Sequence, residues 1–177
     1  MGRPTNPEIE ANIIRFDGIE ARQSSFRPRD MLLPRYERER YSVIGRPAEG
    51  STKGTALGDV KAFSMVYIRC EPGKGIGSHA HESAEVFVVM SGRWEIDVEG
   101  TKTVLNPFDV VSVPPDLFHE ARNVGEEPAV LMALNEGQTG VPIRLDPKLL
   151  NEIRGAGHVV SDPEYPPGPR AEQGVHA

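Results

Sequence analysis

An all-β fold is the class that the sequence predicts, and three observations carry the prediction. Short apolar runs alternate with polar residues at a period of two, as strands with one buried face do. The 16 prolines and 18 glycines are spread between these runs, where they mark turns. One short helical pattern stands near the C-terminal end. The segments expected to form the core strands are Val60–Cys70, Ser78–Met90, Arg93–Glu99, Thr103–Leu105, Asp109–Val113, His119–Asn123 and Ala129–Asn135.

These strand segments differ in how their apolar residues are placed. Val60–Cys70 is mostly apolar on both sides, which indicates a strand that is covered on both faces. Ser78–Met90 becomes continuously apolar from Val86 onward, as a buried strand does. Arg93–Glu99 alternates strictly and therefore predicts one inward and one outward face. The pair Glu99-Gly100 predicts a hairpin turn.

Residues 1–59 form an N-terminal extension that is less regular than the core of residues 60–135. Asn12–Phe16 and Tyr36–Ile44 are candidate strands. Arginines between residues 27 and 40 alternate with aspartate and glutamate, which is typical of a solvated surface with salt bridges rather than of an anion site.

Residues 136–160 contain the short C-terminal helix that we expect. Asp146–Arg154 has a capping aspartate at its start, Pro147 at the first helical position and Gly155 as a stop. Residues 161–177 are rich in proline and poor in apolar residues, which predicts a tail on the surface.

Composition excludes several classes of partner. The net charge is −6, from 26 acidic and 20 basic side chains, which argues against nucleic acid as a partner. No apolar run approaches the roughly 20 residues that span a membrane. The first residues lack the apolar core of a secretory signal, and the single Cys70 cannot form an internal disulfide. A cytoplasmic location is therefore expected.

Three histidines and one glutamate are the candidate metal ligands: His79, His81, Glu85 and His119. Three imidazoles with one carboxylate suit a divalent transition metal. Even spacings separate the first three ligands, so a continuous strand would point them to one face. On a helix, His79 and His81 would lie about 200° apart and could not share an ion.

The residues around these ligands resemble the two signature motifs of the cupin superfamily. The first motif reads Gly73-x5-His79-x-His81-x3-Glu85-x6-Gly92, and the second reads Pro114-x4-His119-x3-Asn123. Phe108 and Asp116 stand where the family usually has glycine. Aspartate tolerates the left-handed backbone of such a position, whereas Phe108 requires either a shifted turn or a gap that its ring fills. The resemblance covers roughly residues 60–135.

The resemblance implies a cupin-type antiparallel β-barrel, also called a jelly roll or double-stranded β-helix, that holds one divalent metal. Iron ranks first, ahead of manganese or nickel and then zinc, because zinc prefers four ligands and would leave little open for chemistry. Around an octahedral ion the four ligands leave positions for water, dioxygen or a chelating substrate. With one carboxylate the centre keeps a net charge of about +1, which attracts an enolate or a carboxylate.

Residues on the ligands' face are candidates for a substrate pocket. Phe87 and Val89 follow Glu85 at even spacing. Further candidates are Met65, Tyr67, Arg69, Trp94, Ile96 and Met132. Core packing is the favoured alternative for any single one of them. Tyr67 and Arg69 stand out because they could bring a donor or a cation to an apolar cavity.

The resemblance leaves three functions open. The first is a metal-dependent dioxygenase acting on a small enolisable or acidic substrate. The second is an isomerase, decarboxylase or lyase that uses the ion as a Lewis acid, for which the sequence offers no clear separate base. The third is a non-enzymatic barrel that binds or senses a small molecule. Because cupin-like proteins often extend a neighbouring subunit's sheet with their N-terminal segment, we also expect a homodimer.

Overall fold

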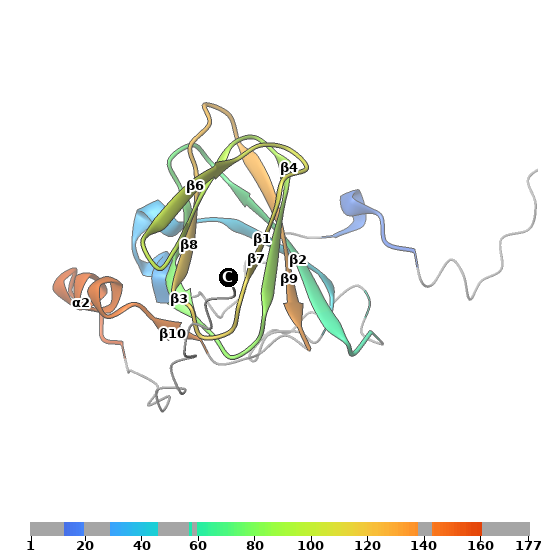
Figure 1. Cartoon of the computed structure of the whole chain (residues 1–177). Coiled ribbons are helices and arrows are strands. Elements are labelled where there is room, and N and C mark those ends of the chain that lie inside the picture. The colour runs from blue at the N-terminus through green and yellow to red at the C-terminus, as the bar shows by residue number, and fades with distance from the viewer. Residues whose placement is uncertain (1–12, 20–28, 46–56, 58–59, 138–142, 161–177) are drawn as a thin grey trace, which may run out of the picture.

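Two antiparallel five-stranded sheets face each other and enclose the core of the protein (Figure 1). The computed structural model describes residues 13–19, 29–45, 57, 60–137 and 143–160. Sheet A consists, in spatial order, of β1 (Glu39–Ile44), β2 (Phe63–Cys70), β9 (Ala129–Glu136), β4 (Glu85–Ser91) and β7 (Val110–Val113). Sheet B consists of β10 (Arg144–Leu145), β3 (Gly75–Ala80), β8 (His119–Asn123), β5 (Trp94–Val98) and β6 (Thr101–Leu105). The predicted all-β barrel is confirmed.

Alternate residues of the strands fill the space between the two sheets. In β2, Ser64, Val66, Ile68 and Cys70 are buried, whereas their neighbours are half-buried. The inward residues of the other strands complete one apolar cluster, whose largest fully buried members are Trp94, Phe87, Ile96 and Leu131. This is the period-two pattern that the sequence predicts.

The expected strand Ser78–Met90 is wrong as one element. β3 ends at Ala80 and β4 begins at Glu85, and the two strands belong to different sheets. The residues between them carry the chain across the barrel, where the His81 carbonyl accepts a hydrogen bond from Asp116 N–H at 2.8 Å. Even spacing persists through this break, which is why the sequence alone gave no sign of it.

Turns with a left-handed backbone connect several strands. Glu99 and Gly100 have φ values of 50° and 84°, which confirms the hairpin between β5 and β6. Phe108 and Asp116 keep the left-handed backbone of the glycines that cupin-like sequences usually have, with φ values of 74° and 64°. Phe108 fills no gap, because it is 80% exposed.

The segments that flank the barrel pack together beside β3. Residues 29–36 form two 3-10 helices, η2 (Arg29–Leu32) and η3 (Pro34–Tyr36), which lie against the helix α2 (Pro147–Gly155). A second apolar cluster joins them, made of Leu33, Leu145, Leu149, Leu150 and Ile153. The Asp146 carboxylate caps α2 by accepting a hydrogen bond from Lys148 N–H at 2.7 Å, as predicted.

The remaining expectations for the flanks have mixed outcomes. The candidate strand at residues 36–44 is confirmed over Glu39–Ile44 as β1, whereas Tyr36 ends η3. Residues 13–15 form no strand, and the 3-10 helix η1 (Phe16–Gly18) follows them, so the expected strand there is wrong over its described part. The proline-rich tail, residues 161–177, lies outside the described residues. Among the helices that the structure describes, none is long and apolar enough to cross a membrane.

Candidate metal centre

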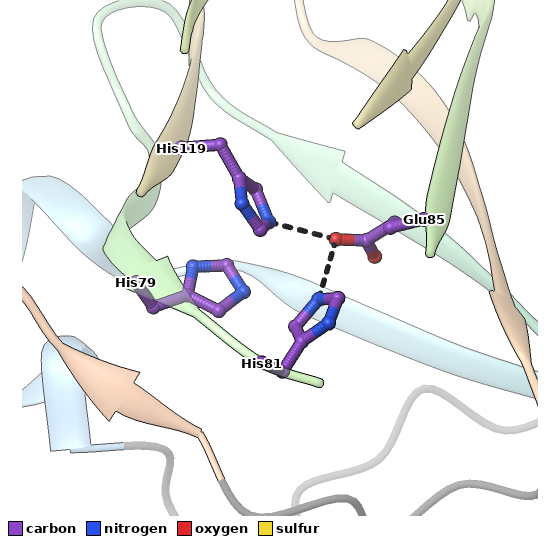
Figure 2. A group of neighbouring side chains, drawn as sticks. All are labelled: His79, His81, Glu85 and His119. Carbon is purple, nitrogen blue, oxygen red and sulfur yellow. Dashed lines mark hydrogen bonds and ion pairs between the residues drawn. The ribbon is translucent and has the colours of Figure 1, made fainter. Parts of the chain in front are cut away.

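Four side chains converge from both sheets at one end of the barrel interior (Figure 2). His79 lies on β3, His81 directly follows that strand and His119 begins β8, so the three imidazoles come from sheet B. Glu85 begins β4 and faces them from sheet A. One ligand atom from each residue lies within 4.8 Å of the others. The four predicted ligands therefore lie close together, although Glu85 belongs to the opposite sheet and does not share a strand with the histidines.

Backbone carbonyls orient all three imidazoles in the same way. Nδ1 of His79 lies 2.9 Å from the Gly77 carbonyl. Nδ1 of His81 lies 2.8 Å from the Ser83 carbonyl, and Nδ1 of His119 lies 2.9 Å from the Leu117 carbonyl. Since a carbonyl oxygen can only accept, each Nδ1 carries a proton, which leaves Nε2 available to share a second proton with Glu85 or to bind an ion. This arrangement is typical of imidazoles that bind a metal.

The Glu85 carboxylate is the negatively charged group of the site, and it lies within hydrogen-bond distance of two imidazoles. Its Oε2 lies 2.9 Å from His119 Nε2 and 3.2 Å from His81 Nε2. Burial would raise the pKa of Glu85, but the hydrogen bonds from His119 and His81 hold it well below its ordinary value. For His81, burial would lower the pKa, yet the hydrogen bond and charge of Glu85 raise it. Burial, reinforced by nearby His119, lowers the pKa of His79 to about 3.

These contacts fit a cation better than they fit the side chains alone. Nε2 lone pairs and a carboxylate oxygen are all acceptors, so distances of 2.9 and 3.2 Å between them require protons or a positive ion in their midst. The low pKa of His79 disfavours a third proton there. The four residues would hold a divalent transition metal through three nitrogens and one oxygen.

The second oxygen of Glu85 is held separately. Asn135 on β9 donates a hydrogen bond from Nδ2 to Glu85 Oε1 at 3.0 Å. Asn135 lies directly opposite Glu85 in the pairing of β9 with β4. The carboxylate therefore offers Oε2 to the imidazoles while Oε1 is engaged by the amide. No pattern in the sequence indicates this role of Asn135.

A buried ion pair fixes the strand that carries His79. The side chains of Asp30 and Arg38 are 3% and 5% exposed and lie 2.7 Å apart. Asp30 also accepts a hydrogen bond from Gly77 N–H at 2.9 Å, and the Gly77 carbonyl binds the His79 ring. The expectation of a solvated charged face holds for the exposed pair of Arg35 with Glu152 but is wrong for Arg38.

The eight pocket candidates fall on two different faces. Phe87, Val89, Trp94 and Ile96 are buried on the inner face of their sheets, as the ligands are. Strand pairing places the other four on the outer face of sheet A: Met65, Tyr67, Arg69 and Met132. The prediction that these four residues line an interior pocket is therefore wrong. Both faces of β2 and β9 are apolar, so alternation alone could not tell which face points inward.

Comparison with known proteins gives a consistent picture of the fold. The family model for the cupin domain matches residues 66–135. A cupin 2 domain-containing protein from Halorhodospira halophila superposes with a TM-score of 0.52 at 25% identity, over 66% of this chain and 75% of that chain. An RmlC-like cupin from Shewanella frigidimarina superposes with a TM-score of 0.50 at 19% identity, over 71% of this chain and 90% of that chain.

Relatives with assigned activities match only in part. A 5-nitrosalicylic acid 1,2-dioxygenase from Bradyrhizobium is 26% identical over 86 residues, which are 45% of this chain and 42% of that protein. A polyketide synthase CurC from Streptomyces cyaneus is 41% identical over 59 residues, 33% of this chain and 38% of that protein. The chain thus covers less than half the length of either relative. The family match over residues 66–135 and the two facing sheets together identify this part of the chain as a cupin domain.

Proposed function

We propose that the protein is a non-haem metal-dependent dioxygenase that acts on a small enolisable or acidic organic substrate, with iron as the working metal. The observation that carries the proposal is the convergence of three imidazoles and one carboxylate inside a barrel whose core is largely apolar. When bound, the metal supplies a Lewis-acidic centre that accepts both substrate and dioxygen. Similarity to a 5-nitrosalicylic acid 1,2-dioxygenase over 86 residues supports the reaction type.

The protein's own residues determine which substrate could enter. Glu85 contributes one negative charge against a divalent ion, so the centre retains about +1 and favours an anionic oxygen. Phe87 and Ile96, which are 1% and 2% exposed, keep water away from the floor of the site. Carbonyls that hold each Nδ1 proton keep all three rings ready to bind without reorienting.

Oxygen consumption tests the proposal. The protein is freed of metal with a chelator, reloaded with Fe²⁺ under anaerobic conditions and mixed with acetylacetone, salicylate or a catechol-like acid in an oxygen-electrode cell. We expect uptake of one O₂ per substrate consumed with at least one of these classes. The His81→Ala variant, treated in the same way, should show none, because it lacks one ligand.

Other outcomes would assign the site differently. Turnover that persists without oxygen would replace the dioxygenase by a Lewis-acid isomerase, decarboxylase or lyase. Metal binding and substrate binding without turnover would leave a non-enzymatic binding barrel. Repeating the assay with Mn²⁺, Ni²⁺ and Zn²⁺ ranks the metals, and activity highest with an ion other than iron would overturn that part of the proposal.

We also propose that a second copy of the chain covers the outer face of sheet A. This face carries the half-buried apolar residues Val86, Val88, Val130, Met132 and Leu134. A sheet face in contact with water normally carries polar residues, so a second apolar face favours a partner. Light scattering should give the mass of two chains, and Met132→Glu should reduce it to one. A wild-type mass of one chain would exclude the dimer.

A cytoplasmic location is part of the same proposal. Cys70 is the single cysteine and is buried, and burial raises the pKa of its thiol to about 12. Such a thiol is unreactive and takes no part in a disulfide within the chain. Cell fractionation with an antibody against the protein would test the location, and recovery with secreted proteins would contradict it.

A further inference from the structure

One polar row crosses the inner face of sheet A. Strand pairing places Ser64 opposite Asn135 and Asn135 opposite Glu85, so the three side chains lie in one line across β2, β9 and β4. We call this line the polar row. The next two inward lines are apolar throughout: Val66, Ala133 and Phe87, then Ile68, Leu131 and Val89. The polar row therefore belongs to the end of the barrel that holds the ligands.

Each member of the polar row except Ser64 has a hydrogen-bond partner. Asn135 donates to Glu85 Oε1, and Glu85 Oε2 meets the imidazoles of His119 and His81. The Ser64 side chain is 1% exposed, and its Oγ has no hydrogen-bond partner in the structure. Buried hydroxyls are almost always paired, so an unpaired one calls for a further binding partner.

The place of Ser64 defines what that partner can be. Neighbouring strands lie about 4.8 Å apart, so Ser64 stands roughly 10 Å across the sheet from Glu85, with Asn135 between them. A molecule whose one oxygen binds the ion can place a second oxygen near Ser64. A hydroxyl donates to such an oxygen, whereas an ammonium group would be repelled by the positive centre.

We propose that Ser64 is a substrate-binding residue whose hydroxyl donates a hydrogen bond to the second oxygen of a small substrate anchored at the metal. The substrate class is a compact molecule with two separated oxygen functions, such as a dicarboxylate or a keto acid. Asn135 is a positioning residue in this arrangement, because its hydrogen bond engages Oε1 of Glu85 and leaves Oε2 directed at the imidazoles. The inference rests on the proposed function only in that a metal occupies the four ligands.

Binding of two simple probes to the Co²⁺-loaded protein tests the inference. Malonate carries a second carboxylate that could reach Ser64, whereas acetate carries none, and both can be followed through the Co²⁺ absorption spectrum. We expect malonate to bind at least tenfold more tightly than acetate, since a hydrogen bond to a charged group adds to the contact with the ion. Ser64→Ala should abolish this difference in affinity and leave acetate affinity and cobalt content unchanged. Ser64→Thr, which keeps a hydroxyl, should restore the preference for malonate.

Thermal unfolding of the metal-free variants provides a readout that is independent of any ligand. Ser64→Ala removes a buried hydroxyl without a partner, so its melting temperature should equal or exceed that of the wild type.

The Co²⁺-loaded protein tests the role of Asn135. Asn135→Ala should change the Co²⁺ spectrum, because Oε1 of Glu85 loses its hydrogen bond. Malonate affinity that is equal in the wild type and in Ser64→Ala, with both folded and loaded, would overturn the inference.

The two proposals fail in distinguishable ways. If Ser64→Ala loses the preference for malonate and the wild type takes up no oxygen, the Ser64 site is supported and the dioxygenase proposal is wrong. Oxygen uptake that Ser64→Ala leaves unchanged in KM and kcat, together with equal malonate affinity, would keep the dioxygenase and remove the Ser64 site. A wild-type protein that takes up no cobalt would overturn both.

Discussion

The two ends of the barrel interior have opposite chemistry. At one end, His119, Glu85 and their neighbours bring ionisable groups together at hydrogen-bond distance. At the other end, Trp94 and Leu131 are 0% exposed among apolar side chains. Trp94 pairs with Asn123, four residues along β8 from His119, which is roughly 13 Å. The apolar end stabilises the fold, and that stability permits an arrangement at the other end that would be costly without a cation.

Removal of Trp94 should produce the largest change in stability. Trp94→Ala leaves a cavity at the apolar end and should lower the free energy of unfolding by about 3–5 kcal/mol, measured by urea denaturation. The fraction that remains folded should bind metal as the wild type does. The exposed Val159→Ala is the matched control and should be neutral. An unchanged midpoint for Trp94→Ala would contradict the division between the two ends.

Removal of one ligand should reduce metal binding while leaving the fold largely intact, which is the reverse of the effect expected for Trp94→Ala. His81→Ala should lower metal affinity by at least an order of magnitude, as loss of a direct ligand does, with little change in the circular dichroism spectrum. Metal content after dialysis against a competing chelator measures the effect. His158→Ala serves as the control, because that residue lies outside the group of ligands. Equal metal content in His81→Ala and the wild type would disprove the site.

Acid should destabilise the ligand end of the metal-free protein. Burial lowers the pKa of His79 to about 3, so between pH 6.5 and that value the unfolded chain binds a proton that the folded chain does not. The free energy of unfolding therefore falls as pH falls through this window. Glu85 adds to the trend below its ordinary pKa of 4.5, because the hydrogen bonds from His119 and His81 outweigh burial and lower its pKa.

His81 acts in a separate window. Its pKa is raised, since the charge of Glu85 outweighs burial, so its stabilising effect is complete below pH 6.5 and is lost as pH rises above that value. Melting temperatures of the chelator-treated protein from pH 6.5 to pH 4 should fall steadily. Trp94→Ala should show the same slope from a lower starting point. A flat profile would mean that His79 is not buried in neutral form.

The smallest effects concern one left-handed residue at each end. Phe108 N–H binds the Val89 carbonyl near the apolar end, whereas Asp116 N–H binds the His81 carbonyl at the ligand end. Phe108→Gly should raise the free energy of unfolding by about 1 kcal/mol, because it relieves a left-handed backbone and removes an exposed ring. Asp116→Gly should change it less, since aspartate tolerates this conformation. Equal shifts in melting temperature would contradict this reasoning.

Local sequence patterns predicted most strands and the helix, but they could not predict which strands pair with each other across the sheets. Period-two alternation located β5 and β8, and the capping aspartate located α2. The four ligands were found from residue types and family spacing, but the strand argument for Glu85 failed because the chain crosses to the other sheet after Ala80.

Several functional candidates carry no local signal. Ser64 and Asn135 are 71 residues apart, and only the pairing of β2 with β9 brings them side by side. Asp30 and Arg38 look like surface charges in sequence, and their burial depends on β3 and α2 packing over them. Sequence patterns therefore identify the candidate ligands, while the groups that hold them in place emerge only from tertiary contacts.

The Asp30–Arg38 pair sets a limit on how far the chain can be shortened. A fragment trimmed to residues 66–135 would leave Gly77 N–H without its carboxylate acceptor and would deprive β3 of its edge neighbour β10. Such a fragment would keep every ligand in its sequence yet lose the strand position that aims His79. A fragment that keeps this support must therefore include Asp30, Arg38 and β10, all of which lie outside the residues that the family model matches.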